Sequence, residues 1–224
     1  MALNLLMLGP PGAGKGTQAE RFAKKRSIPK ISTGDMLRES LKAGTEIGLR
    51  AKAIMERGEL VNDEVMIGIV KERLARADAQ DGFILDGFPR TVAQAKALDR
   101  LMEGRAALVV IDITVPESEL VRRLSSRIVC EECGLNAEGI ELSQMSTTPC
   151  PRCSGRLKQR SDDSADVVRE RLKVYRRDTQ PLVDFYRDRA TFRQVFGAQS
   201  PDQVEKELEH AVTHATKPSD GRRA

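Results

Sequence analysis

The chain has 224 residues, of which 40% are hydrophobic and 31% charged, the balance of a globular protein with enough chain to bury a substantial core. Its net charge of +4 would suit a nucleic-acid binder, but aromatic residues make up only 4% of the chain and tryptophan is absent, so few side chains could stack on bases. The apolar run at residues 3–8 is too short to span a bilayer and has no basic leader, which argues against a membrane protein and leads us to expect a cytoplasmic one.

A glycine-rich loop follows this apolar run directly. Residues 9–17 read GPPGAGKGT, and Gly9, four further residues, Gly14 and Lys15 form the pattern of a phosphate-binding loop. Glycines let backbone N–H groups turn toward an anion, and the lysine bridges the outer phosphates. Apolar residues recur at helical spacing over residues 17–25, so the positive end of a helix would face the phosphates. This stretch predicts a nucleoside triphosphate site.

A short strand at residues 30–31 precedes three predicted helices. The first spans residues 32–42 behind a Ser-Thr-Gly-Asp cap, the second spans residues 45–58, and the third begins at Asn62. We expect these helices to form a small insertion between strands.

Two apolar strands follow, at residues 82–86 and 107–114, and the second is apolar enough to be covered on both faces. A helix capped by Thr91 lies between them, and a helix opened by Pro116 comes after them.

The last third of the chain continues this alternation. A long basic helix is predicted from Asp163 or Ser164 to about Arg189, with a bend or break at Pro181. A strand at residues 192–196 and a helix at residues 201–212 complete the pattern, and residues 215–224 lack periodicity and are expected to be disordered. The alternation predicts an α/β fold, a parallel five-stranded sheet with helices on both faces, of P-loop NTPase type.

Four cysteines form two Cys-x-x-Cys pairs, Cys130 with Cys133 and Cys150 with Cys153, separated by sixteen residues. This spacing is typical of one tetrahedral zinc, and four thiolates would close its coordination sphere, so the metal would be structural. Two disulfides or an iron site are the alternatives, and a cytoplasmic location disfavours the disulfides. The segment 126–163 has no apolar stretch that could form a core, so we expect a metal to supply folding energy to a small mobile flap.

The chain resembles the adenylate kinase family and its nucleoside monophosphate kinase relatives over residues 3–212. The glycine loop has Gly16 after its lysine and Thr17 one place later, where the general motif has Ser or Thr after the lysine. This narrower pattern is similar to that of the family, and so are the sequences STGDMLR at residues 32–38 and DGFPR at residues 86–90.

The resemblance implies three groups of site residues. The donor ATP would contact Gly12, Ala13, Gly14, Lys15, Gly16, Thr17, Arg123, Arg127 and Gln199. The acceptor AMP would contact Thr33, Arg38, Glu59, Leu60, Val61, Gly87, Phe88, Pro89, Arg90, Gln94, Arg160 and Arg171. Catalysis would rest on Lys15, Asp86, Arg90, Arg123, Arg127, Arg160 and Arg171.

Several roles follow from the same resemblance. Thr33 would lie near the acceptor base, Arg38 and Arg90 would bind its phosphate, Gln94 would read adenine, and Asp86 would lie near Mg²⁺. The implied reaction is reversible, Mg²⁺-dependent, direct in-line transfer, ATP + AMP = 2 ADP, which maintains adenine nucleotide balance. We expect a monomer whose partners are ATP, AMP and ADP, with no nucleic acid or membrane partner.

The resemblance also divides the chain into parts. Residues 32–61 would be the AMP-binding insertion and residues 126–163 the zinc-binding lid, both closing over the site to exclude water. Residues 1–31, 62–125 and 164–214 would form the core domain, and residues 215–224 the tail.

Two departures from the family pattern affect the donor side. Ala137 and Glu138 stand where zinc-bearing relatives usually have a Tyr-His pair, which puts stacking of the lid on the donor base in doubt. Gln199 stands where the family often has lysine, which is tolerable if only the backbone binds the base.

Two other functions are open alternatives. A kinase for UMP or CMP, or one with GTP as donor, is similar, but pyrimidine kinases tend to have Ala where Thr33 stands and a short lid without cysteines. The cysteine segment could instead bind nucleic acid, in which case binding would weaken steeply with salt. Four further arginines are expected to be solvated or paired with acids, namely Arg122, Arg169, Arg176 and Arg177.

Overall fold

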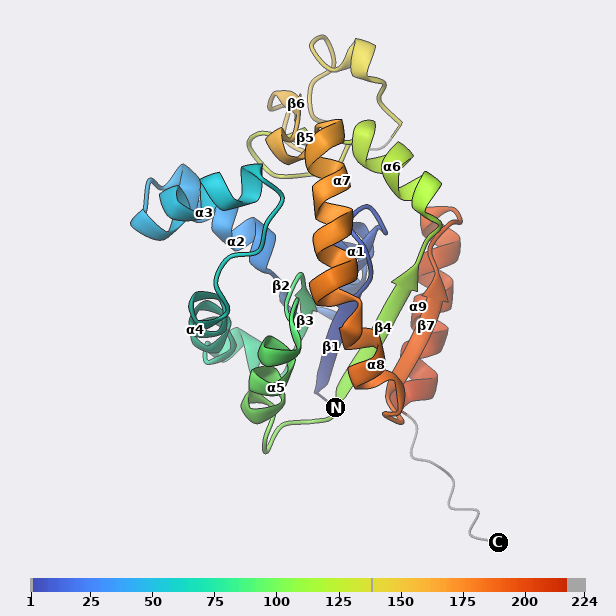
Figure 1. Ribbon diagram of the computed structural model, residues 1–224. Coiled ribbons are helices and arrows are strands. Elements are labelled where there is room, and N and C mark those ends of the chain that lie inside the picture. The colour runs from blue at the N-terminus through green and yellow to red at the C-terminus, as the bar shows by residue number, and fades with distance from the viewer. Residues whose placement is uncertain (1, 138, 217–224) are drawn as a thin grey trace, which may run out of the picture.

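A parallel sheet forms the centre of the computed structural model, which describes residues 2–137 and 139–216 (Figure 1). Its five strands have the order β2-β3-β1-β4-β7, and each neighbouring pair is parallel. The strands are β1 (Leu3–Leu8), β2 (Lys30–Ser32), β3 (Gly82–Asp86), β4 (Leu108–Thr114) and β7 (Phe192–Phe196). The predicted α/β fold is therefore confirmed, and the carboxyl ends of the strands meet at one edge of the sheet.

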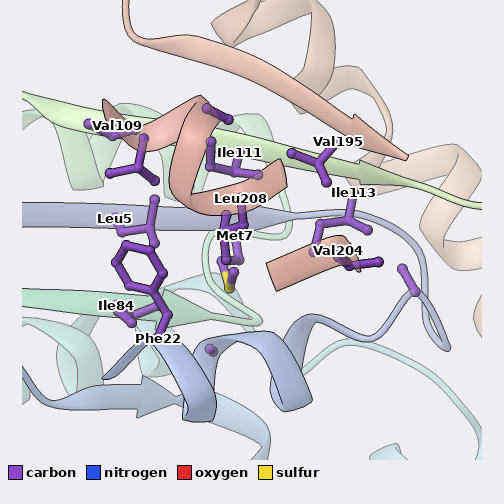
Figure 2. Packing of buried hydrophobic residues seen from close by; sticks show 14 of the residues in the cluster. Leu5, Met7, Phe22, Ile84, Val109, Ile111, Ile113, Val195, Val204 and Leu208 are labelled. Carbon is purple, nitrogen blue, oxygen red and sulfur yellow. The ribbon is translucent and has the colours of Figure 1, made fainter. Parts of the chain in front are cut away.

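Both faces of the sheet are covered by helices, as a central strand buried on both faces requires. Leu5 and Met7 of β1 point into a cluster that includes α1 (Lys15–Arg26) and α9 (Pro201–Thr216) (Figure 2). Leu6 and Leu8 point the other way, into a cluster with α4, α5 and α8. These helices span Asp63–Leu74, Val92–Leu101 and Pro181–Arg187.

Of the three helices expected in the insertion, α2 (Thr33–Lys42) and α3 (Glu46–Glu56) lie beside the sheet (Figure 1). The third, α4, instead packs against α5 in the core. The expected caps begin α2 and α3, because the Ser32 hydroxyl accepts from the Asp35 N–H and the Thr45 hydroxyl accepts from the Gly48 N–H.

The cysteine segment has more structure than its sequence suggested. It lies between α6 (Glu117–Ser125) and α7 (Ala165–Val174), and β5 (Ile128–Cys130) pairs antiparallel with β6 (Leu157–Gln159). The expectation that the segment has no core is wrong, since a small buried cluster combines apolar residues from separate turns with two of the cysteines. Its buried members are Ile128, Cys130, Ala137, Cys150 and Leu157. No contiguous apolar stretch forms this cluster, so sequence periodicity gave no sign of it.

The predicted break at Pro181 is confirmed, and a wider helical turn precedes it. A π-helical turn at Tyr175–Thr179 ends α7, the Gln180 N–H donates to the Tyr175 carbonyl at 2.8 Å, and α8 begins at Pro181 itself. Proline has no N–H to donate one turn back, so the chain widens before it. Short 3-10 turns complete the described elements, at Ala77–Ala79, Leu142–Gln144 and Ser161–Asp163.

The final helix is longer than predicted, because α9 continues to Thr216. The expected tail thus begins two residues too early, and its remainder, residues 217–224, lies outside the described residues. None of the helices in the described ranges is long and apolar enough to cross a membrane.

Candidate active site

A cavity of about 1430 Å³ opens at the carboxyl ends of β1 and β3, the edge where parallel α/β sheets bind ligands. Its wall combines the glycine loop, α2, the 58–61 stretch, the loop after β3, α6, the lid, α7 and the 197–201 stretch. The cavity is larger than the roughly 300–1,000 Å³ of a pocket for one small ligand. It therefore has room for more than one nucleotide.

The glycine loop wraps one side of this cavity. Gly9 has a φ of 135°, and a Cβ there would lie 2.6 Å from the Ile113 carbonyl oxygen, so only glycine fits. The loop delivers the chain into α1, whose first residue is Lys15. The Lys15 ammonium donates to the carbonyls of Gly9 and Pro10 at 2.7 and 2.9 Å. Burial lowers the Lys15 pKa to about 8, and the negative charge of Asp86 offsets part of this effect.

Asp86 ends β3 and lies across from the glycine loop. A Cβ on Gly16 would come within 3.4 Å of the Asp86 Oδ2 atom, so the carboxylate faces the start of α1. A Cβ at this position would be in ordinary van der Waals contact with the carboxylate. Thr17, one place later, also lines the cavity, and carboxylate and hydroxyl oxygens are the kind of ligand that Mg²⁺ prefers.

The cavity brings together nearly all of the nucleotide-binding residues predicted from the sequence. Those in its wall are Gly12, Ala13, Gly14, Lys15, Gly16, Thr17, Thr33, Arg38, Glu59, Leu60, Val61, Asp86, Gly87, Pro89, Arg90, Gln94, Arg123, Arg127, Arg160, Arg171 and Gln199. Phe88 is the exception, because its side chain is 1% exposed and packs in the apolar core.

Gln94 lines the cavity, but its amide is already engaged at both ends. Its Oε1 accepts from the Arg90 N–H at 2.7 Å, and its Nε2 donates to Asp63 Oδ1 at 2.7 Å. To hydrogen-bond an adenine, the amide would have to release one of these partners. Gln94 therefore also has a structural role, because its hydrogen bonds fix the loop that carries Arg90.

Arginines crowd the space between the glycine loop and the insertion. Arg127 and Arg171 are neutralised, since both bind the carboxylate of Asp163 and Arg171 also lies 3.0 Å from Asp162. Among residues 2–137 and 139–216, neither Arg90 nor Arg160 forms an ion pair. Burial, followed by the charge of Arg127, lowers the Arg160 pKa to about 10.

Burial also lowers the pKa of Arg90, and the charge of Arg171 adds to the effect. The Arg90 Nε atom donates to the Gly87 carbonyl at 2.9 Å, and the Thr33 hydroxyl donates to the same carbonyl at 2.8 Å. These hydrogen bonds fix the guanidinium without neutralising it. An anion with several oxygens would satisfy such a cluster of cations.

On the donor side, Arg123 is held rigidly by two acceptors. Its Nε donates to the Glu119 carboxylate at 2.7 Å and its Nη2 donates to the Gly197 carbonyl at 2.9 Å. The Gln199 side chain is bound to Phe196 and Glu207, so the 197–201 stretch offers mainly backbone atoms to a ligand. Ala137 lies in the cavity wall.

Glu138, the other lid position that departs from the family pattern, lies outside the described residues. The arginines expected to be solvated or paired do pair with acids. The pairs are Arg122 with Glu119, Arg169 with Asp166, Arg176 with Glu117, and Arg177 with Asp178.

The four cysteines converge within the lid. Their sulfur atoms all lie within 4.8 Å of one another, and the sulfurs of Cys130 and Cys153 are 3.5 Å apart, those of Cys133 and Cys150 3.6 Å. All four are free thiols. Sulfurs placed about 2.3 Å from a tetrahedral zinc would be roughly 3.8 Å apart, so this arrangement fits the metal and disfavours the disulfide alternative.

The sequence analysis did not assign several residues to the site. Lys30 and Asp35 line the cavity, Asp63 holds Gln94 and Thr91, and Asp162 and Asp163, which were expected only as partners of solvated arginines, neutralise arginines of the site. The run Arg160-Ser-Asp-Asp was the available sign of the last two, because acids directly after a site arginine are ready partners for its neighbours. No pattern in the sequence indicates that Lys30 or Asp63 points inward.

Comparison with known proteins finds a matching family and several similar proteins. Residues 7–191 match the family described as Adenylate kinase. An adenylate kinase of Archaeoglobus fulgidus is 50% identical over 92% of this chain and 96% of its own length. Adenylate kinases of Magnetococcus marinus and Desulfitobacterium hafniense are each 46% identical, over 92% and 95% of this chain and 98% and 99% of their own lengths.

Proposed function

The chain belongs to the adenylate kinase family and is a nucleoside monophosphate kinase, and from this premise we propose that it transfers a phosphoryl group reversibly from ATP to AMP, giving two ADP. The observation that carries the proposal is the single cavity, in which the glycine loop faces the acceptor-side residues across unneutralised arginines. Two anionic nucleotides can be aligned there, and phosphoryl transfer needs alignment and charge stabilisation more than it needs a protein nucleophile.

The donor would lie on the glycine-loop side. Backbone N–H groups of residues 12–17 and the positive end of α1 suit its phosphates, and Lys15 would turn from two loop carbonyls to the outer phosphates. Arg123 and Arg127 would bind donor phosphates, and the backbone near Gln199 would contact the base. Since Mg²⁺ neutralises the phosphate oxygens when bound, we assign its site to Thr17 and Asp86.

The acceptor would lie between the insertion 32–61 and the loop after β3. Arg38 and Arg90 would bind the AMP phosphate, with Thr33 and the 59–61 stretch around the nucleoside. Arg160 of the lid and Arg171 of α7 both line the cavity and would bind phosphates of both nucleotides. As negative charge spreads over the equatorial oxygens in the transition state, these guanidinium groups would stabilise it in place.

The division into a core (1–31, 62–125 and 164–214), an acceptor insertion (32–61) and a lid (126–163) explains how water is excluded. Closure of both insertions would complete the arginine cluster only when two nucleotides are bound. The Cys130, Cys133, Cys150 and Cys153 site would hold zinc and stiffen the lid. One chain supplies every group, so we propose that the enzyme works as a monomer.

Two-substrate kinetics test this mechanism. We expect initial rates of ADP formation that give intersecting lines when ATP and AMP are varied together, because direct transfer requires both nucleotides on the protein at once. We also expect EDTA to abolish turnover, with excess Mg²⁺ restoring it. Parallel lines would indicate a phosphorylated enzyme and would contradict direct transfer.

A further inference from the structure

Lys30 is a cation in the cavity wall that neither the family motif nor the proposed mechanism uses. It lies on β2, the edge strand, with its Cα opposite Ile84 of β3. Its side chain is 21% exposed, and its Nζ lies 3.3 Å from Asp35 Oδ2. The lysine therefore links the rigid sheet to the first turn of α2, the helix that carries Arg38.

Asp35 is shared between two cations. Lys30 contacts its Oδ2 atom, whereas the Arg38 Nη2 atom contacts its Oδ1 atom at 2.5 Å. Because each cation uses a different oxygen, one can leave without disturbing the other. Burial by itself would raise the Asp35 pKa, but the charges of Arg38 and Lys30 hold this pKa well below its usual range. Asp35 thus stays a carboxylate at any working pH.

Arg38 is held away from an extended conformation in this arrangement. A Cβ on Gly34 would lie 3.1 Å from the Arg38 Nη2 atom, so the guanidinium folds back over Gly34 to reach Asp35. An AMP phosphate must draw Arg38 from this carboxylate. If Lys30 were absent, the departure of Arg38 would leave Asp35 without a cation beside it. Its carboxylate would then repel the same phosphate from a few ångströms away.

We propose that Lys30 is a positioning residue for the acceptor site, which keeps Asp35 neutralised when Arg38 moves to the AMP phosphate. The inference rests on the proposed function, since it takes Arg38 as a phosphate ligand. Lys30 acts through Asp35 rather than on the phosphate, and it lowers the cost of releasing Arg38. Its Nζ also lies near the glycine loop, 4.0 Å from the place that a Cβ would take on Gly16, but its contact with a carboxylate is to Asp35, so we expect the larger effect on AMP.

Lys30→Gln removes the charge and keeps most of the side chain. We expect it to raise KM and Kd for AMP about threefold to fivefold, the scale of a partly exposed ion pair. The KM for ATP and kcat should stay within a factor of two, and Lys30→Arg should restore the affinity for AMP. A matched control is Lys52→Gln, which breaks a lysine–carboxylate pair on α3 of the same insertion and should change neither nucleotide's affinity.

Asp35→Asn distinguishes a positioning role from direct phosphate binding. In that background there is no carboxylate to neutralise, so adding Lys30→Gln should leave Kd for AMP unchanged. A threefold or larger loss in the double variant would overturn the proposal and make Lys30 a phosphate ligand. An unaltered Kd in the Lys30→Gln single variant would also overturn it. Calorimetric binding of AMP to the wild-type protein is measured first, because its absence would reject the proposed function itself.

Discussion

Lys15 shows how burial changes the protonation of a cation in this site. Its ammonium donates to two backbone carbonyls within the part of the chain that the structure describes, and burial lowers its pKa to about 8. The bound phosphates of a nucleotide would favour the charged form, so binding and protonation are linked. Burial also lowers the pKa values of Arg90 and Arg160, but guanidinium groups keep their protons near neutral pH. Lys15 is therefore the cation of the site through which pH would act.

The affinity for ATP should fall as the pH rises above about 8. Above this pKa the free protein has lost the Lys15 proton and must take one up to bind the anion, so affinity should drop by up to about tenfold per pH unit. Calorimetry at pH 7 and pH 9, in buffers of different ionisation enthalpy, measures both the affinity and the proton uptake. Lys15→Met should bind weakly with no such dependence, and a wild-type affinity that is flat across this range would contradict the assignment.

Individual site residues were predictable where a motif fixes the backbone. The glycine loop and the four cysteines were located because their geometry depends on spacing alone. Gln94 and Lys30 illustrate the limit, since their roles depend on partners such as Asp63 and Asp35 that tertiary packing supplies. A sequence names side chains but does not say which of their polar atoms are already engaged.

Among the described parts of the chain, the lid has the smallest cluster of buried residues. Its two-stranded sheet is short, and two of the five buried residues in its cluster are cysteines. Four thiols within 4.8 Å of each other can be held together by a metal, which would convert binding free energy into folding free energy.

Cys150→Ala should therefore abolish stoichiometric zinc and lower the Tm, by about 5 to 10 °C for a loss of 2 to 3 kcal/mol in a chain of this size. The phosphoryl-transfer residues lie outside the cysteine cluster, so activity should persist at low temperature. Metal analysis, differential scanning calorimetry and limited proteolysis between residues 130 and 153 provide the readouts. Thr147→Ala is the control within the lid, and a metal-free variant as stable as the wild type would refute a structural zinc.

Element boundaries followed closely from capping chemistry. Ser32, Thr45, Asn62 and Thr91 each cap the helix predicted to begin there. The strands β5 and β6 were missed because three residues are too few for a periodic pattern. The π-helical turn before Pro181 was missed because proline indicates a break but not how the preceding turn accommodates it.

At the scale of the whole molecule, contacts across the cavity mouth connect the three predicted parts. Arg152 of the lid pairs with Glu20 of α1, and Lys42 of α2 donates to the Glu131 carbonyl of the lid. These links join the lid to both the core and the insertion, and they involve exposed groups that can separate readily. Alternation of strands and helices predicted the sheet, whereas the approach of the insertions across the cavity depends on these long-range contacts and could not be predicted.

Acceptor choice tests the central claim most directly. ADP formation is measured from ATP and Mg²⁺ with AMP, UMP, CMP or GMP in separate reactions, beside a reaction with ATP alone. We expect rapid turnover with AMP, little with the other three, and almost none with water as acceptor. Preference for UMP or CMP, or no transfer to any monophosphate despite ATP binding, would contradict the acceptor site built around Thr33, Arg38 and Arg90.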